Sequence, residues 1–385
     1  MFQKIKKFTY TVFDLICDFI KKETVLTIAA ILAVISSFFV KPNKEYLTYI
    51  DWRVLGILLS LMVVVAGFQR NGLFDSIGRK LLSKTKDTAQ LIGVLVFLCF
   101  FSSMLITNDV ALLTFVPFAL VILKKSGQER LMILVFVLQT IAANLGSMLT
   151  PIGNPQNLYL YNLAGVDIMT FMGWMLPYTL ISGLLLLVII IISGKEKQEI
   201  SADESSFSVK ESKGSAKKNV IYSFLFALSL LVVIRLIPYY VVLPIILVIV
   251  FFLDREVLFN VDYCLLLTFI CFFIFIGNMG NLPLVRDTLQ SLVAGREVVI
   301  GIAASQIVSN VPAALLLSGF TDNYKALTLG VNIGGLGTLI ASMASLISYK
   351  IYAHNFNKTK GIYLMWFTAA NVGFLVVLIV TYLLI

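Results

Sequence analysis

The sequence predicts an all-α polytopic membrane protein whose two halves are related as an inverted repeat. Of the 385 residues, 59% are hydrophobic and 13% are charged, and the mean hydropathy is +0.94. A soluble domain carries about 25% charged residues, so this chain could not cover a globular surface with polar groups. Long apolar runs recur along the chain, and two short segments rich in Asn, Ser, Thr and Gly occur once in each half.

The apolar runs give the expected spans. A helix needs about 20 mostly apolar residues to cross a bilayer, and nine runs approach or exceed that length. Two further apolar stretches, 89–123 and 297–320, are broken near their middle by polar residues, so we expect re-entrant hairpins there. The nine spans are expected at 24–40, 51–69, 131–160, 171–193, 220–236, 238–253, 261–277, 326–350 and 361–385.

The distribution of basic residues predicts how these spans are oriented. The net charge is +9, and cytoplasmic loops of membrane proteins are enriched in Lys and Arg. With nine spans and two hairpins, 23 of the 30 Lys and Arg residues fall on the side of the amino terminus. If either hairpin crossed the membrane fully, this asymmetry would largely vanish. We therefore expect a multi-pass protein of the plasma membrane, with its amino terminus in the cytoplasm and its carboxyl terminus outside.

Two polar segments separate the expected domains. Residues 1–23 place Phe and Leu between Lys and Asp, which predicts an amphipathic helix on the membrane surface. Residues 194–219 lack apolar periodicity and are expected to form a flexible cytoplasmic linker. The first repeat is then 24–193, with its hairpin at 89–123, and the second is 220–385, with its hairpin at 297–320.

The two halves share polar residues in the same order. Residues 144–161 align without a gap to 332–349, and residues 101–118 align to 303–320. By the charge distribution, the span that Asp51 opens and the span that Asp262 opens cross in opposite directions, so the repeat is expected to be inverted. The polar and glycine identities are Ser103/Ser305, Asn108/Asn310, Asn144/Asn332, Gly146/Gly334, Thr150/Thr338 and Tyr161/Tyr349.

These repeated segments predict a binding site at the membrane midplane. Non-helical backbone is tolerated inside a bilayer only where protein buries it or a wet cavity lines it. Paired interrupted helices in two halves are the best sequence indication of a transporter's site. Helix N-termini there would suit an anion, whereas carbonyl and side-chain oxygens would suit Na⁺. The alternative explanation for Gly and Pro in membrane helices is kinking and close packing.

Asp109 is the single acidic residue that the expected spans place at the midplane. A buried carboxylate is costly unless it is paired or protonated, so its presence calls for a partner. It could bind a cation, carry a proton or accept a hydrogen bond from a ligand. Alternatively, it could be a neutral or locally bonded cap of the helix that follows.

Other hydroxyl and amide groups are expected near the same place. Ser103 and Ser305 lie one helical turn before the two hairpin tips, so their hydroxyls either face the pocket or bond back to their own helix. Polar residues also follow each broken helix, and their types differ between the halves. These are Thr150, Asn154 and Asn157 in the first half and Thr338, Ser342 and Ser345 in the second.

At these motifs the chain resembles the ion-transporter superfamily that includes divalent anion/sodium symporters, citrate transporters, arsenite permeases and sodium/proton antiporters. TNDVALLTFVPF and NLGSMLTPIGNPQN look most like its anion-permease and arsenite-permease members. The resemblance implies a homodimer in which part of each protomer moves as an elevator. In the dicarboxylate branch both tips read Ser-Asn-Thr and contact substrate and sodium, whereas here Asp109 and Val311 occupy the third position.

The motifs and the resemblance together define the expected site. For the substrate we expect Thr107, Asn108, Asp109, Thr150, Pro151, Asn154, Ser309, Asn310, Val311 and Thr338. For a coupling cation we expect Ser103, Asn108, Asp109, Asn144, Gly146, Ser305, Asn310, Asn332 and Gly334.

The expected function is secondary active transport of a small anion, such as a carboxylate (citrate or another dicarboxylate) or an oxyanion, coupled to Na⁺ or H⁺. Because Asp109 would repel a dianion unless protonated or cation-bound, a nearly neutral oxyacid is also an expected substrate. Arsenite permease or Na⁺/H⁺ antiporter are the alternatives, and a passive channel is a third. Expected partners are the lipid bilayer and a second copy of the chain, and not nucleic acid.

An enzyme is not expected. Intramembrane aspartyl catalysis needs two facing acids, whereas the spans place one at the midplane. His354 is the single histidine, and it lies away from the expected membrane centre. The four cysteines form no CxxC pair and are expected to be packing residues. No cofactor is expected other than Na⁺ as a coupling ion.

Overall fold

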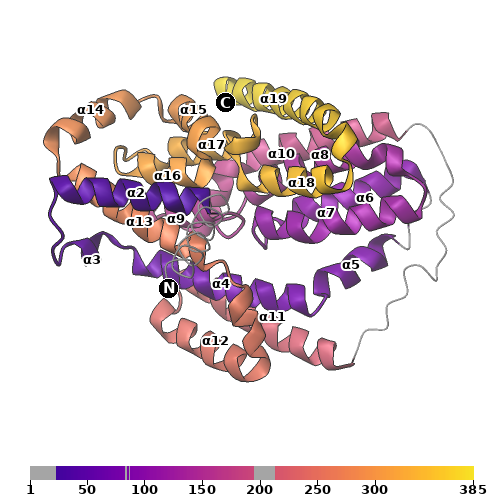
Figure 1. Cartoon of the computed structure of the whole chain (residues 1–385), viewed down its shortest axis with the longest axis horizontal. Coiled ribbons are helices and arrows are strands. Elements are labelled where there is room, and N and C mark those ends of the chain that lie inside the picture. The colour runs from indigo at the N-terminus through magenta and orange to yellow at the C-terminus, as the bar shows by residue number, and fades with distance from the viewer. Residues whose placement is uncertain (1–22, 83–84, 86, 195–212) are drawn as a thin grey trace, which may run out of the picture.

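The computed structural model describes residues 23–82, 85, 87–194 and 213–385, and every regular element in these residues is helical (Figure 1). The expected surface helix at 1–23, apart from Glu23, and most of the expected linker lie outside the described residues. Helix α11 begins at Lys213, within the segment expected to be linker.

The first half contains nine α-helices among its described residues and one 3-10 helix. They are α2 (Thr24–Phe39), α3 (Tyr46–Tyr49), α4 (Trp52–Arg70), α5 (Leu73–Leu82), α6 (Thr88–Ser102), α7 (Asn108–Lys125), η1 (Glu129–Leu131), α8 (Met132–Ser147), α9 (Pro155–Ala164) and α10 (Ile168–Ser193).

The second half continues in the same manner. Its elements are α11 (Lys213–Val233), α12 (Tyr239–Asp254), η3 (Arg255–Asn260), α13 (Tyr263–Gly280), α14 (Pro283–Val293), α15 (Glu297–Val308), α16 (Asn310–Ser318), α17 (Tyr324–Ile333), η4 (Leu339–Ala341), α18 (Met343–Asn355), η5 (Asn357–Thr359) and α19 (Lys360–Leu384).

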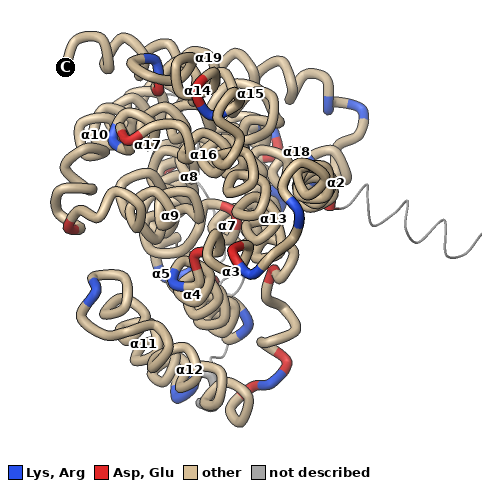
Figure 2. The backbone as a smooth tube through the Cα atoms, turned by 90° about the vertical axis from the view of Figure 1, so that its left-hand side faces the viewer, with Lys and Arg blue, Asp and Glu red and all other residues tan. Residues whose placement is uncertain are grey.

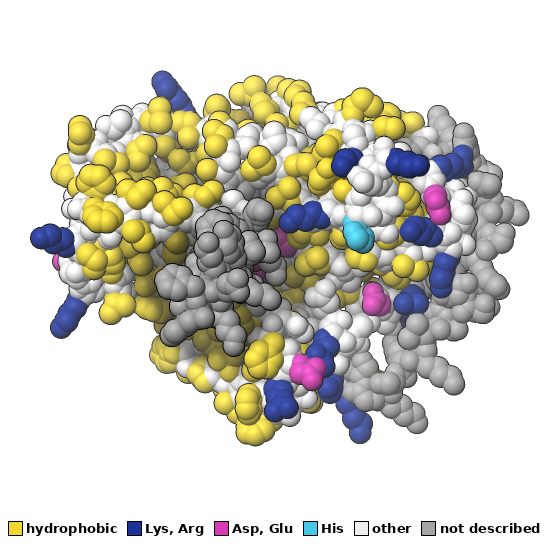
Figure 3. Space-filling model, viewed as in Figure 1, with side chains coloured by type: hydrophobic (Ala, Val, Ile, Leu, Met, Phe, Trp, Pro, Cys, Tyr) yellow, Lys and Arg dark blue, Asp and Glu magenta, His cyan; other side chains and the backbone are white. Residues whose placement is uncertain are grey.

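Six helices of the described residues are long and apolar enough to cross a membrane. A seventh candidate is the pair α14 and α15, which is bent by 108°. Hydrophobic side chains cover much of the face seen in Figure 3, as a lipid-facing surface requires. The expected all-α polytopic membrane protein is therefore confirmed, while the count of nine spans stays a prediction.

Helices α4 and α13 begin in the same way. The carboxylate of Asp51 accepts a hydrogen bond from the backbone N–H of Val54 at 3.0 Å, and that of Asp262 accepts one from Leu265 at 2.9 Å. Each aspartate thereby satisfies an N–H group that has no partner within its helix. The two Asp residues that the sequence aligned thus have equivalent local geometry.

Helices of one half pack against helices of the other half, and we call this arrangement the exchanged packing. Helix α2 lies along α13, where Asn278 Nδ2 donates to Ser36 Oγ at 2.9 Å, and α4 packs on α11 and α12 (Figures 1 and 2). Gly67 lets α4 approach α11, since a Cβ there would lie 2.0 Å from the Tyr222 ring. Gly56 does the same beside α12, because a Cβ there would lie 2.5 Å from Tyr239.

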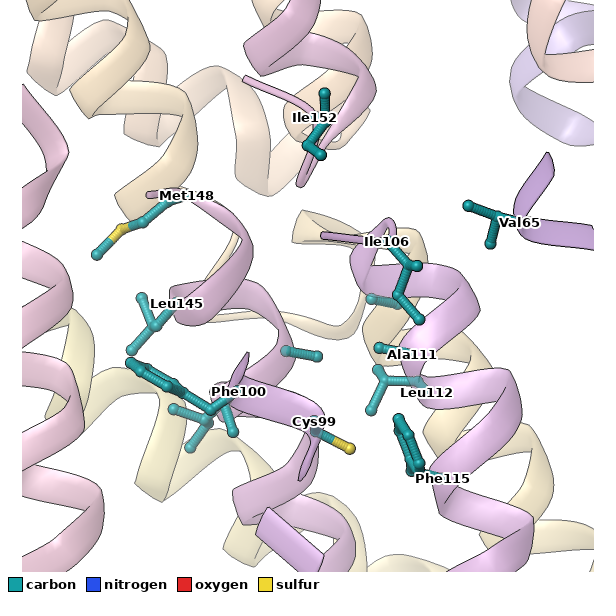
Figure 4. Close-up of a cluster of buried hydrophobic side chains, with 14 of the residues drawn as sticks. Val65, Cys99, Phe100, Ile106, Ala111, Leu112, Phe115, Leu145, Met148 and Ile152 are labelled. Carbon is teal, nitrogen blue, oxygen red and sulfur yellow. The ribbon is translucent and has the colours of Figure 1, made fainter. Parts of the chain in front are cut away.

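The interrupted segments are held by a core of apolar side chains. Helices α6, α7 and α8 pack together in the first half, and α15, α16 and α17 do so in the second. Figure 4 shows Cys99, Leu112 and Phe115 side by side between α6 and α7, below Ile106 of the turn that joins these helices, while Phe100 points the other way, towards Leu145 of α8. Across the halves, α7 contacts α18 and α9 contacts α16. These contacts bring the two hairpin tips and the two helix breaks together.

Candidate functional site

Four polar chain breaks meet at the centre of the helix packing. Two are the turns between α6 and α7 and between α15 and α16. The other two separate α8 from α9, at residues 148–154, and α17 from α18, at residues 334–342. We call this region the junction. The sequence predicted all four breaks, and the structure brings most of their polar side chains into one hydrogen-bonded region.

Asn144 links three of these breaks. Its Oδ1 accepts hydrogen bonds from Asn108 Nδ2 and from Ser342 Oγ, each at 2.9 Å. Its Nδ2 donates to the carbonyl of Gly335 at 3.5 Å. Asn108 and Asn144 are only 4% and 3% exposed. A buried amide is costly unless bonded, so this network fixes the first tip against the second broken helix.

Asn332 makes a second connection between the halves. Its Nδ2 donates to Asn157 Oδ1 at 2.7 Å and to the carbonyl of Thr328 at 2.8 Å. Its Oδ1 accepts from Asn154 Nδ2 at 3.5 Å, and Asn154 also donates to Ser147 Oγ at 2.7 Å. The two aligned asparagines, Asn144 and Asn332, therefore each bond to the interrupted segment of the opposite half.

The two hairpin tips have equivalent local bonding. Asn108 Oδ1 accepts from the N–H of Asp109 at 3.0 Å, and Asn310 Oδ1 accepts from the N–H of Val311 at 2.9 Å. Ser309 is the first residue of the second tip and has φ of 76°, a left-handed conformation that is unusual for a residue other than glycine. Strained backbone of this kind concentrates at functional sites.

The aligned glycines permit close approach of the helices. A Cβ at Gly146 would lie 2.1 Å from the carbonyl oxygen of Phe100 and 2.7 Å from Ser103 Oγ. A Cβ at Gly334 would lie 2.8 Å from Ser305 Oγ. Both serine hydroxyls are buried and donate to a carbonyl of their own helix, Ser103 to Phe100 and Ser305 to Gly301. Of the two alternatives for these serines, the structure therefore has the back-bonded one.

The remaining expected residues divide between the junction and its margin. Thr107 is half-buried at the first tip, and Pro151 is buried in the break between α8 and α9. Thr150 Oγ1 donates to the carbonyl of Met104 at 2.5 Å, and Val311 is half-buried at the second tip. Thr338, in contrast, is exposed, so it lies at the margin although its aligned mate Thr150 lies inside.

Asp109 lies in the first turn of α7 and is half-buried. Its Oδ1 is buried and has no hydrogen-bond partner within the part of the chain that the structure describes. A carboxylate at the N-terminus of a helix gains from the helix dipole. That gain does not replace a direct partner, so this oxygen is available to a cation, a proton or a ligand hydroxyl.

Three other buried residues at the junction also carry polar atoms without a partner among the described residues. They are Asn154, through Oδ1, Gln156, through both Nε2 and Oε1, and Ser345, through Oγ. Buried polar atoms are nearly always bonded, so such a group calls for an explanation. Acceptor oxygens outnumber donors in this set, which suits a cation or a ligand that carries hydroxyl hydrogens.

A cavity lies beside each tip, and the two differ in size. One of about 30 Å³ is lined by Thr107 and Asn154 together with apolar residues of α4. The other, of about 180 Å³, is lined by Val311 and Pro312 with residues of α2, α13 and α18, and by the charged Glu23 and Asp262, which precede α2 and α13, and Lys350. We call these the first-tip cavity and the second-tip cavity. The second tip is thus approached by the larger and more polar space.

Two glutamines at the site were missed by the sequence analysis. Gln306 donates from Nε2 to the carbonyls of Gly334 and Leu336 at 2.8 and 2.9 Å, and its Oε1 accepts from the N–H of Thr338 at 2.9 Å. Gln156 lies between Asn154 and Asn157 and is fully buried. Gln306 aligns with Met104, so a polar residue without a mate in the repeat could have indicated it.

Comparison with known proteins identifies the family of the chain. Residues 15–324 match the citrate transporter family. The chain is 34% identical over 314 residues to an uncharacterized transporter of Methanocaldococcus jannaschii, covering 80% of this chain and 83% of that protein.

Two further relatives are more distant. The chain is 29% identical over 326 residues to the inner membrane protein YbiR of Escherichia coli, covering 82% of this chain and 84% of that protein. It is 27% identical over 198 residues to a silicon efflux transporter of Oryza sativa, covering 49% and 40%. The match to the family extends over most of the chain, and the resemblance noted in the motifs is confirmed. The chain therefore belongs to the citrate transporter family and is a membrane transporter rather than an enzyme.

Proposed function

We propose that the protein is a secondary active transporter of a small anion or oxyacid, coupled to Na⁺ or H⁺, with its binding site at the junction. The observation that carries this proposal is the set of unpartnered buried atoms of Asp109, Asn154, Gln156 and Ser345. A ligand or ion bound among them would satisfy atoms that are otherwise costly to bury.

We propose that the two halves form an inverted repeat with nine spans and two re-entrant hairpins. The exchanged packing supports this. If α12 is the counterpart of α2 and α13 the counterpart of α4, the contact of α2 with α13 is repeated by the contact of α12 with α4. In the same way, if α16 is the counterpart of α7 and α18 the counterpart of α9, the contact of α7 with α18 is repeated by the contact of α16 with α9. The similar bonding at the two tips and at the two aspartate caps adds to this support.

We propose that transport follows an elevator movement in a homodimer, as the resemblance implies. The unequal cavities support alternating access. In an inverted repeat, exchanging the conformations of the halves would open the first-tip cavity and close the second-tip cavity. The conformation described here would then be open on the side of Glu23, Asp262 and Lys350.

Within this mechanism, Asp109 is proposed to couple the driving cation or proton to transport. Asp109→Asn keeps the shape of the side chain but removes its charge. In proteoliposomes it should abolish uptake driven by a Na⁺ or H⁺ gradient, while exchange of substrate across the membrane without a gradient persists. Asp287→Asn, on exposed α14, is the matched control. Gradient-driven uptake by Asp109→Asn equal to that of the unmodified chain would overturn the role of Asp109.

The substrate can be identified by binding to the purified protein. A thermal-shift screen would use citrate, succinate, sulfate, phosphate and arsenite, each with and without Na⁺. A ligand at 100 times its dissociation constant stabilises the protein by about 2.7 kcal/mol. A shift that needs both one compound and Na⁺ would support symport. If none shifts the transition at any pH with or without Na⁺, a small anion or oxyacid as substrate is contradicted.

A second candidate function is efflux of a weakly acidic, nearly neutral oxyacid in exchange for protons. The excess of acceptor oxygens at the junction favours it, because a protonated hydroxy acid donates hydrogen bonds where a dianion only accepts them. Similarity to a silicon efflux transporter also favours it. Arsenite or silicic acid uptake into inverted vesicles, stimulated by an outward proton gradient and insensitive to Na⁺, would distinguish this function from carboxylate symport.

A further inference from the structure

Helix α5 borders a third cavity that the proposed transport cycle does not use. This cavity has a volume of about 340 Å³ and lies between α5, the end of α4 and the outer side of α7. Helix α5 is amphipathic: Phe74, Gly78 and Leu82 are buried, whereas Asp75 and Arg79 line the cavity. Gly78 brings α5 close to α7, since a Cβ there would lie 2.9 Å from the Phe118 ring.

Helix α7 forms one wall of this cavity, and the residues along this wall change from apolar to basic. Leu113, Pro117, Val121 and Lys125 follow one another at intervals of four residues, so they lie along one face of the helix. The first three are apolar and exposed, with Leu113 and Val121 each 48% exposed, and the fourth is basic. An exposed apolar stripe that ends at a cation matches a lipid tail joined to an anionic headgroup.

The charges that line the cavity favour an anion. Among the described residues that line it, Arg79 on α5 and Lys125 on α7 are the cations, and Asp75, one turn before Arg79, is the acid. Gln69 and Thr114 add an amide and a hydroxyl, and Gln69 Nε2 lies 3.4 Å from Thr114 Oγ1. Most Lys and Arg side chains on the face in Figure 3 also lie over its right-hand half, toward the end of the molecule where α5 and α7 end in Figure 1.

We propose that an anionic phospholipid binds in this cavity, with its phosphate between Arg79 and Lys125 and an acyl chain along Val121, Pro117 and Leu113. Basic groups at a membrane surface bind anionic lipids, and arginine forms paired hydrogen bonds to phosphate. Because α5 connects α4 to α6, the lipid would contact the segment that joins the core of the site to α4.

The test measures lipid binding to the full chain purified in detergent. The probes are short-chain phosphatidylglycerol, short-chain phosphatidylcholine and glycerol 3-phosphate, with binding followed by thermal shift. The expected order of affinity is phosphatidylglycerol first, then phosphatidylcholine, with glycerol 3-phosphate weakest. Arg79→Gln with Lys125→Gln should weaken phosphatidylglycerol binding roughly 25-fold, about fivefold for each charge.

The controls separate charge, apolar contact and free anion binding. Arg286→Gln with Lys44→Gln removes the same charge from exposed positions that do not line the cavity and should leave binding unchanged. Val121→Asn should weaken both lipids and leave glycerol 3-phosphate unaffected. Equal weakening by the two double variants would overturn the proposal, as would equal affinity for both lipids. Glycerol 3-phosphate binding as tightly as phosphatidylglycerol would overturn it in favour of a free phosphate site.

Discussion

At the scale of single residues, glycines set how closely the interrupted helices approach. Replacing Gly146 with Ala would place a Cβ 2.1 Å from the Phe100 carbonyl oxygen, a distance that only a backbone shift can relieve. Such overpacking costs about 1–3 kcal/mol. We expect Gly146→Ala to lower the melting temperature of the protein and to abolish most of its transport.

The control for this substitution is Gly173→Ala on α10, where an added Cβ would meet no atom of the described residues within 4 Å. Alanine is the better helix former, so this variant should be as stable as the unmodified chain or slightly more stable. If the two variants melted at the same temperature, the close approach at Gly146 would not matter to stability.

Single residues of the site could be predicted where the two halves agree. Asn108, Asn144 and Asn332 were expected from their identity in the repeat. Asn144 and Asn332 make bonds that join the halves, and Asn108 bonds to Asn144 within the first half. Thr338 was expected by the same reasoning but is exposed, because the repeat fixes a position in the chain and not the burial of its side chain. Gln156 was missed because its mate Ala344 is apolar, so the two halves do not agree at that position.

At the scale of elements, the broken helix α17 depends on one side chain. Gln306 bonds to the carbonyls of Gly334 and Leu336 and to the N–H of Thr338, so it supplies partners that the interrupted helix has lost. Gln306→Leu keeps most of the volume but removes three bonds. At about 1 kcal/mol for each bond, it should measurably lower the free energy of unfolding.

Gln290→Leu on exposed α14 is the matched control and should have little effect. Thermal unfolding in detergent compares the two variants. A melting temperature of Gln306→Leu that matches the control would show that solvent, and not Gln306, satisfies the broken helix.

The sequence predicted the long helices and the breaks better than the short helices. Helix α7 begins at Asn108 and α16 at Asn310, where the polar tips were expected. Helices α5 and α14 lie between the expected spans and were not predicted, because both are short and amphipathic and so give no long apolar run. Whether α6 and α15 re-enter the membrane cannot be read from hydropathy, since a hairpin and a full span have the same composition.

At the scale of the whole molecule, the unequal cavities predict unequal access to the two tips. Leu265 lines the second-tip cavity and is half-buried, whereas Leu61 lines the first-tip cavity and is 7% exposed. In a cysteine-free chain carrying Leu265→Cys, a water-soluble maleimide should react readily. In a cysteine-free chain carrying Leu61→Cys, the same reagent should react slowly.

A transported substrate should change the ratio of these two rates, since it would alter the populations of the two conformations. Equal rates at both positions, unaffected by any transported substrate, would contradict alternating access between the two cavities.

The exchanged packing of α2 on α13 has a consequence for how the protein is made. Helix α2 is synthesised early, but its partner α13 ends at Gly280, some 240 residues later. Throughout most of translation α2 must therefore rest against lipid, its Ser36 without the Asn278 amide that it later binds. Neither half can complete its own packing alone, so assembly of the mature protein must follow insertion of the second half.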